Sequence, residues 1–190
     1  MNWILASGSP RRRELLEMLG VPDLTIRSAT GPERATPGAG PEQTVRELSL
    51  HKAQEVAQTC APEDIIIAAD TIVYLDGAIL GKPKDHDDAV RMLTALSGRE
   101  HIVYTGVAVL RGGELRQAAE HTAVRFRALT PAEIERYIAT GEPMDKAGAY
   151  GIQGRGALFV AHLDGDYFNV MGLPLCRLGQ LLNELGVELL

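Results

Sequence analysis

Cysteine is scarce in this chain of 190 residues, which contains only Cys60 and Cys176. The two residues lie far apart, and neither belongs to a pattern with the spacing of a metal site. So few cysteines exclude a small fold held together by disulfides and suit a reducing compartment. We therefore expect a cytoplasmic protein that is stabilised by its core.

The chain also lacks a long apolar run and an excess of positive charge. No stretch reaches the roughly 18 consecutive apolar residues that a membrane-spanning helix needs, and the amino terminus lacks the basic and apolar regions of a signal peptide. The net charge of -6 argues against general nucleic-acid binding, which requires a broad basic surface. The apolar fraction of 45% is enough for a core, and the length predicts a single domain over residues 1–190.

The stretch IIIAADTIVYLDGAILGKP at residues 65–83 is the most informative part of the sequence. Three β-branched residues and two alanines predict a fully buried strand that ends at Asp70. Because ligands of open α/β sheets bind beyond the carboxyl ends of strands, we expect Asp70 to face a cleft and to handle a metal ion, a water molecule or both. Thr71 and Lys82 add a hydroxyl and an ammonium group. From this stretch alone, an aspartate that caps the next turn is an equal alternative.

Three consecutive arginines, Arg11 to Arg13, follow a Ser-Gly-Ser-Pro turn. Ser9 suits the N-cap of a helix and Pro10 suits its first position. Cations are unfavourable at a helix N-terminus unless an anion lies there. Because backbone N–H groups and guanidinium groups together form a phosphate site, we expect phosphate at this turn. Three solvated arginines are the alternative.

Apolar residues recur at helical spacing over residues 41–57 and predict a helix. Lys52 falls inside this apolar stripe, where a lysine must extend to solvent or meet an anion. With a phosphate site expected nearby, we favour a contact with a ligand. The preceding loop, residues 21–40, carries Glu33 in its middle section, and a solvated side chain is the simpler interpretation of that residue.

The remaining chain alternates between strands and helices. Asp76-Gly77 predicts a hairpin turn, Asp85 predicts a helix N-cap, and Thr130 to Glu133 form a capping box. Further elements are expected as strands at 24–28, 101–110, 115–127 and 157–163 and a helix at 174–185.

The run at residues 145–154 contains too much glycine for a core element. Such loops allow the backbone to approach a ligand closely. Within the run, Gln153 offers an amide for a base edge or a ribose. A mobile loop with a solvent-facing glutamine is the alternative.

Motifs spread over nearly the whole chain resemble the Maf proteins, a family of nucleoside triphosphate pyrophosphatases. They are ILASGSPRRRELLEMLG, HKAQEVA, AADTIVYLDGAILGKP, LSGREHIVYTGVAVL, and DKAGAYGIQGRGALFV followed by GDYFNVMGLPL. Agreement of several separate motifs is more specific than any one of them. The resemblance implies an elongated α/β fold with a curved mixed sheet flanked by helices. It also implies two lobes around a central cleft, as in inosine triphosphate pyrophosphatases.

The activity that the resemblance implies is hydrolysis between the α- and β-phosphates, with Mg²⁺ or Mn²⁺ as cofactor. Within the family, Asp70 matches the proton acceptor. Arg12, Thr71 and Gln153 match positions associated with substrate choice in the branch that acts on dTTP and UTP. A branch that acts on 7-methyl-GTP carries a different loop where this chain has Tyr150 to Gln153.

Concentrated positive charge is required by a triphosphate, which carries about four negative charges near neutrality. Lys52 and Lys82 match recurrent basic positions of the family, and Arg13 adds a further cation. Glu33 is a candidate metal ligand. The family often carries an acidic residue just before this glutamate, where this chain has Gly31-Pro32.

Two other functions compete with an enzyme that removes non-standard pyrimidine nucleotides. One is a nucleotide-binding regulator of septum formation without turnover, because Maf proteins are linked by name to that process. The other is a nucleic-acid binder that uses the three arginines, which the acidic balance disfavours. The resemblance makes a homodimer a reasonable expectation.

Overall fold

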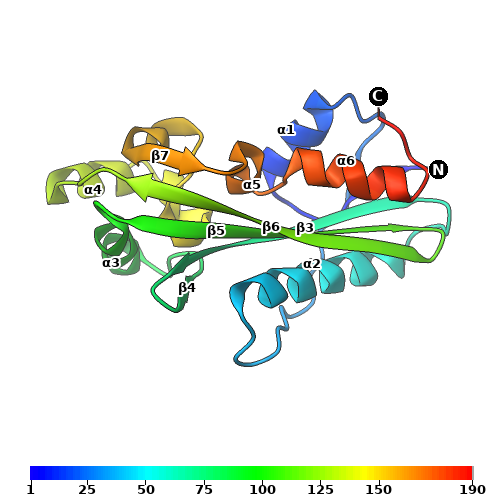
Figure 1. The fold of residues 1–190 in the computed structure, drawn as a ribbon, viewed down its shortest axis with the longest axis horizontal. Coiled ribbons are helices and arrows are strands. Elements are labelled where there is room, and N and C mark those ends of the chain that lie inside the picture. Colours follow the sequence, from blue (N-terminus) through cyan, green and yellow to red (C-terminus); the bar gives the residue numbers. More distant parts are fainter. Residues whose placement is uncertain (190) are drawn as a thin grey trace. The chain divides into compact units, whose positions relative to one another are not determined.

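The computed structural model describes residues 1–189 and contains a seven-stranded mixed sheet with helices packed on it (Figure 1). The strands are β1 (Trp3–Leu5), β2 (Thr25–Ile26), β3 (Ile65–Leu75), β4 (Ala78–Leu80), β5 (Glu100–Arg111), β6 (Glu114–Phe126) and β7 (Val160–Asp164). The helices are α1 (Pro10–Met18), α2 (Pro41–Ala57), α3 (His86–Leu96), α4 (Pro131–Ile138), α5 (Tyr167–Met171) and α6 (Leu175–Glu184). Short 3₁₀ segments cover Glu142–Asp145, Ala147–Ala149 and Gly154–Phe159.

The strand order is β2-β1-β3-β5-β6-β7, and β4 pairs with β3 off this path. β1 is parallel to both of its neighbours, with Ile4 opposite Thr25 on β2 and Ile66 on β3. β4 and β7 are antiparallel to their partners. This combination confirms the expected mixed α/β class. None of the helices in the described part of the chain combines the length and the apolar character that crossing a membrane requires.

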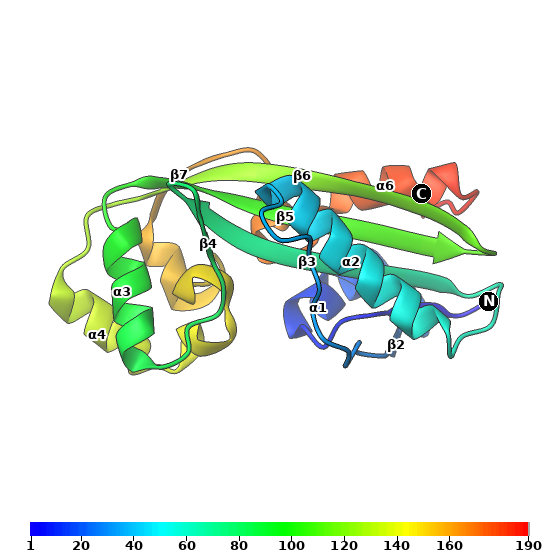
Figure 2. The same cartoon turned by 90° about the horizontal axis from the view of Figure 1, so that it is seen from below.

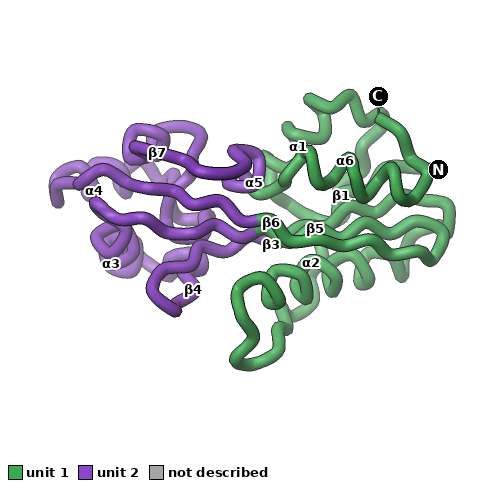
Figure 3. The backbone as a smooth tube through the Cα atoms, in the orientation of Figure 1, with its two compact units in different colours: residues 1–70, 105–120, 172–190 green, residues 71–104, 121–171 purple. Residues whose placement is uncertain are grey.

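The chain divides into two compact units (Figure 3). Unit 1 comprises residues 1–70, 105–120 and the chain from Gly172 onward, and unit 2 comprises residues 71–104 and 121–171. β3, β5 and β6 contribute residues to both units. The expectations of a single domain and of a central cleft stay predictions.

Within unit 1, α2 covers one face of the strands, and α1 and α6 lie on the other face (Figures 1 and 2). Part of the core joins β1, α2 and β3 through small and branched residues, including Ile4, Ala53, Val56 and Ile66. α2 approaches β5 so closely that a Cβ atom at Gly106 would collide with the backbone of the helix.

Within unit 2, α3 packs against α4 (Figure 2). The core of this unit is richer in aromatic side chains and includes Phe126, Tyr137, Tyr150 and Phe159. α4 begins with the expected capping box, in which the Thr130 side chain accepts from the backbone of Glu133 and the Glu133 side chain accepts from the backbone of Thr130.

Several local predictions are confirmed. The helix at Pro41–Ala57 has the expected bounds, the side chain of Asp85 caps α3, and the hairpin at Asp76-Gly77 joins β3 to β4. The final helix begins at Leu175, and its leucines are buried on one face.

Three predictions need correction. The buried strand does not end at Asp70 but continues to Leu75, because the Thr-Ile-Val-Tyr segment that follows also favours a strand. The glycine-rich run is not excluded from the core, since Ala149, Tyr150 and Ile152 in it are buried. The strand expected at 157–163 begins only at Val160, after a 3₁₀ segment.

Candidate active site

Asp70 lies in the middle of β3 and is 8% exposed. Its Oδ1 atom accepts a hydrogen bond from the Nζ atom of Lys52, which extends from α2. The same ammonium group lies 2.9 Å from Oε1 of Glu33. Lys52 therefore bridges two carboxylates from segments that are distant in sequence.

The local sequence explains why Lys52 points inward. It lies in the stripe of α2 that also contains the buried residues Leu48, Ala53 and Val56, so its aliphatic stem runs along the core. Its side chain is only 20% exposed, and an ammonium group in that position requires an anionic partner. Asp70 supplies that partner. The predicted anion is thus present, but it is a protein carboxylate.

Two glutamates of α2 bind the loop that carries Glu33. One contacts the loop before Glu33 and the other contacts it after Glu33. Glu55 accepts a hydrogen bond from the backbone N–H of Thr30 at 2.7 Å, and Glu47 accepts one from that of Thr36, also at 2.7 Å. These backbone donors lower the pKa of both glutamates. The contacts hold an irregular segment in place and thereby orient Glu33.

Arg12 of α1 is half-buried and donates hydrogen bonds to two other segments of unit 1. Its Nε atom donates to the carbonyl oxygen of Gly172 at 2.7 Å, and one terminal nitrogen donates to Oγ of Ser7 at 2.9 Å. Burial lowers the pKa of Arg12, whereas the negative charges of Asp70 and Glu33 raise it. The guanidinium therefore lies within electrostatic reach of the two carboxylates that Lys52 bridges.

Arg13 has a different environment from Arg12. It is exposed, and its Nε atom lies 2.7 Å from Oε1 of Glu17, one turn along α1. Such an exposed pair contributes little to stability. The expected contact of Arg13 with substrate stays a prediction.

The other expected substrate-binding residues belong to unit 2. Thr71 directly follows Asp70 and is half-buried, Lys82 is exposed, and Gln153 is half-buried. The backbone N–H of Gly148 donates to the carbonyl oxygen of Gly81 at 3.0 Å, so the segments that carry Lys82 and Gln153 are joined within this unit.

Sequence reasoning missed the residues that hold the site residues in place. Ser7 belongs to the turn before the arginines. Its position only five residues before Arg12 is a local signal that its hydroxyl can accept from that guanidinium group. Glu47 and Glu55 have no local signal, because their partners lie in an irregular loop.

The two carboxylates near Lys52 offer oxygen donors of the kind that a divalent cation binds. Within residues 1–189, no group of three or more His, Cys, Asp or Glu side chains could hold a metal ion. Asp70 and Glu33 nevertheless direct carboxylate oxygens at one cationic group. Mg²⁺ commonly uses one or two carboxylates and completes its coordination with water and substrate phosphates. These two residues therefore fit such an ion.

Comparison with solved structures first defines the class of fold. A HAM1 protein from Coxiella burnetii matches with a TM-score of 0.55 and 17% sequence identity, over 97% of this chain and 99% of that one. At this identity the match concerns the fold alone. The protein is thus an α/β protein of the HAM1 fold class.

Sequence comparison identifies the family. The profile of the Maf-like proteins matches residues 2–185, so the chain belongs to the Maf family. A dTTP/UTP pyrophosphatase from Moorella thermoacetica is 52% identical, over 97% of this chain and 95% of the relative. A dTTP/UTP pyrophosphatase from Symbiobacterium thermophilum is 50% identical, over 96% of this chain and 93% of the relative.

Proposed function

We propose that this protein hydrolyses dTTP and UTP, and modified pyrimidine triphosphates, to the nucleoside monophosphate and pyrophosphate. Relatives with about 50% sequence identity are named as dTTP/UTP pyrophosphatases, which supports this activity. The single structural observation that carries the proposal is the buried Asp70 in contact with Lys52, with Glu33 on the same ammonium group and Arg12 within electrostatic reach. Charged groups from three other segments of unit 1 thus lie around the carboxylate of Asp70.

The chemistry of these residues follows from the needs of phosphoryl transfer, in which catalysis is mainly positioning and charge stabilisation. Asp70 orients a water molecule and accepts its proton as the water attacks phosphorus. Lys52 and Arg12 stabilise the charge on the phosphate oxygens. Lys52 already has two anionic partners, so phosphate binding requires it to share or exchange one of them.

A divalent cation is the expected cofactor. Asp70 and Glu33 would hold it, and when bound it would neutralise phosphate charge and acidify a water molecule. Thr71, Lys82 and Gln153 are the proposed substrate contacts from unit 2, with Gln153 reading the nucleobase.

The decisive experiment measures pyrophosphate release from dTTP and UTP with Mg²⁺ or Mn²⁺ present. We expect Asp70→Asn to lose about 10²- to 10⁴-fold in turnover, the range that a positioned general base contributes, while nucleotide binding persists. Asp64→Asn is the matched control, because Asp64 is also buried but accepts hydrogen bonds from the backbone of Asn2 at 2.9 Å and Ala61 at 3.0 Å. Near-normal turnover of Asp70→Asn would refute the assigned role.

The same assay separates the enzyme from a regulator of septum formation without turnover. A wild-type protein that binds nucleotide and releases no pyrophosphate from any triphosphate in a panel would support the regulator. The panel should include ordinary and modified pyrimidine triphosphates and purine triphosphates.

The second prediction concerns Gln153. We expect Gln153→Ala to change the preference between pyrimidine and purine triphosphates more than it changes the rate on the best substrate. Its amide can form paired hydrogen bonds with a base edge, whereas alanine cannot. Equal losses on all nucleotides would contradict a role in base recognition.

Location and assembly are part of the proposal. Cys60 and Cys176 are free thiols, which supports a reducing compartment such as the cytoplasm. We also propose a homodimer that does not bind nucleic acid. Light scattering of the purified protein and a DNA-binding titration at several salt concentrations test these two points.

A further inference from the structure

Glu142 follows α4 and accepts hydrogen bonds from a segment more than ten residues away. Its Oε2 atom accepts from the backbone N–H of Arg155 at 3.0 Å, and its Oε1 atom accepts from that of Gly156 at 3.2 Å. Burial alone would raise the pKa of Glu142, but these donors and a tyrosine hydroxyl lower it below its ordinary value. The side chain is therefore an ionised acceptor at neutral pH.

Tyr137 extends this network to the other side of Gln153. Its hydroxyl donates to Oε1 of Glu142 at 2.9 Å and accepts from the backbone N–H of Gly151 at 3.2 Å. Tyr137 is 4% exposed, and burial raises its pKa, so the hydroxyl keeps its proton. A connected pair of side chains thus holds the backbone before Gln153, at Gly151, and after it, at Arg155 and Gly156.

The backbone of residues 154–156 packs closely against the carboxylate of Glu142. Gly154 has a φ of +73°, and a Cβ atom there would lie 2.8 Å from Oε2 of Glu142. A side chain at this position would both strain the backbone and displace the carboxylate. Lys146 holds the backbone that carries this carboxylate, because its Nζ atom donates to the carbonyl oxygen of Glu142 at 2.6 Å.

Gln153 itself depends on this support. It is half-buried, and its side-chain amide has no hydrogen-bond partner within residues 1–189. The direction of the amide is therefore set by the backbone on either side of it. A binding group must be held within a fraction of an ångström to discriminate between ligands, and misplacement by about 1 Å is costly.

We propose that Tyr137 and Glu142 are positioning residues that hold the 151–156 segment so that Gln153 can recognise the nucleobase. This inference rests on the role proposed above for Gln153. Neither residue is assigned contact with substrate. Their effect is expected on substrate preference, which a general loss of stability does not alter.

The test measures kcat/KM for dTTP, UTP and a purine triphosphate in Tyr137→Phe and Glu142→Gln. We expect the pyrimidine preference to fall about tenfold in each variant, since both lose a support of the Gln153 segment. Each change is then repeated in a Gln153→Ala background, where it should alter the preference less than about twofold because the recognising amide is already absent.

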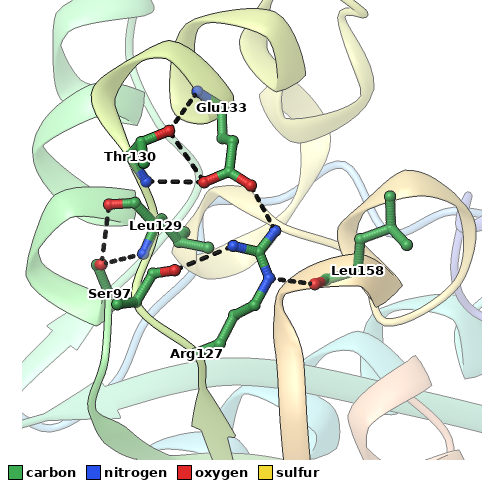
Figure 4. Close-up of polar contacts among 7 residues, drawn as sticks. Ser97, Arg127, Leu129, Thr130, Glu133 and Leu158 are labelled. Carbon is green, nitrogen blue, oxygen red and sulfur yellow. Dashed lines mark hydrogen bonds and ion pairs between the residues drawn. The ribbon is translucent and has the colours of Figure 1, made fainter.

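Glu133→Gln provides the matched control. Glu133 lies at the opposite end of α4, where it accepts from Arg127 at 2.7 Å and from the backbone of Thr130 at 2.8 Å (Figure 4). Arg127 also donates to the carbonyl oxygen of Leu158, so this cluster too connects α4 to the chain that follows Gln153. We expect this variant to lose stability and to keep the wild-type substrate preference.

The outcomes separate the inference from the proposal on which it depends. If Gln153→Ala leaves the preference unchanged, the role of Gln153 fails and the inference falls with it. If Gln153→Ala changes the preference but Tyr137→Phe and Glu142→Gln do not, the inference alone is overturned. Equal changes in both backgrounds also overturn it. If Glu142→Gln does not fold, Tyr137→Phe carries the same test, because it removes a single hydroxyl.

Discussion

Replacing Gly106 with alanine should damage both stability and catalysis, although Gly106 touches no proposed substrate group. The residue lies in β5 beneath α2, and a Cβ atom there would lie 2.9 Å from the backbone nitrogen of Arg46 and closer still to the carbonyl group of Val45. Both obstacles are helix backbone, so no side chain can rotate away to make room. The helix must move.

The size of the effect follows from the geometry. Restoring ordinary van der Waals separation from the carbonyl oxygen of Val45 requires α2 to shift by more than about 1 Å. Overpacking of this kind costs about 1–3 kcal/mol of unfolding free energy, and we expect the upper end because rigid backbone is displaced. Lys52 lies seven residues after Val45 and on the same face of α2, so the shift should reach its contact with Asp70. A displacement of about 1 Å at a catalytic group can cost roughly 10²-fold in rate.

Urea unfolding and pyrophosphate release measure the two effects separately. Gly179→Ala is the control, because Gly179 lies in α6 of the same unit and a Cβ atom there would meet nothing within 4 Å. This control should be neutral or gain up to about 1 kcal/mol from helix propensity. Wild-type stability and turnover of Gly106→Ala would refute the idea that close packing of α2 on β5 sets the position of Lys52.

Two further predictions concern the dependence of stability on pH in unit 2. Burial lowers the pKa of His101 to about 4, so below its ordinary pKa of 6.5 only the unfolded state gains this proton, and about 3 kcal/mol should be lost between pH 6.5 and 4. Urea titrations of His101→Gln should lack that part of the slope, and an unchanged slope would contradict a buried neutral imidazole. Arg127 lowers the pKa of Glu133 to about 2, so the stabilising contribution of Glu133 should be present above about pH 4.5 and disappear as the pH falls toward 2. The stability difference between wild type and Glu133→Gln should shrink over that range, and a constant difference would contradict the assigned ion pair.

The elements that could be predicted from the sequence are those with local signals. The helix at Pro41–Ala57 begins at a proline and has a regular apolar stripe, and the capping box at Thr130 specifies a helix start within four residues. Such signals depend on neighbours in the chain, and tertiary packing agrees with them here.

The failures share a different cause. The apolar run that stops at Asp70 predicts a strand end there, but β3 continues past this residue and its buried carboxylate, whose desolvation is costly. The cost is offset by Lys52, and nothing in either segment indicates that the two residues meet. Likewise, the glycines at 145–154 predict a loop outside the core, whereas the buried Tyr150 anchors that run in the core through a hydrogen bond to His101 at 2.8 Å. Both outcomes depend on partners distant in sequence.

The balance of charge around Asp70 bears on how a triphosphate can bind there. Arg12 and Lys52 carry positive charges, and Asp70 and Glu33 oppose them with negative ones. A nucleotide would bring about four further negative charges into surroundings where charges interact more strongly than in bulk water. Lys52 is already engaged by both carboxylates. Two cations therefore cannot compensate for the charge of the nucleotide alone. We therefore propose that the nucleotide binds together with a divalent cation, which would offset charge on both the phosphates and the carboxylates and would leave Lys52 available for contact with substrate.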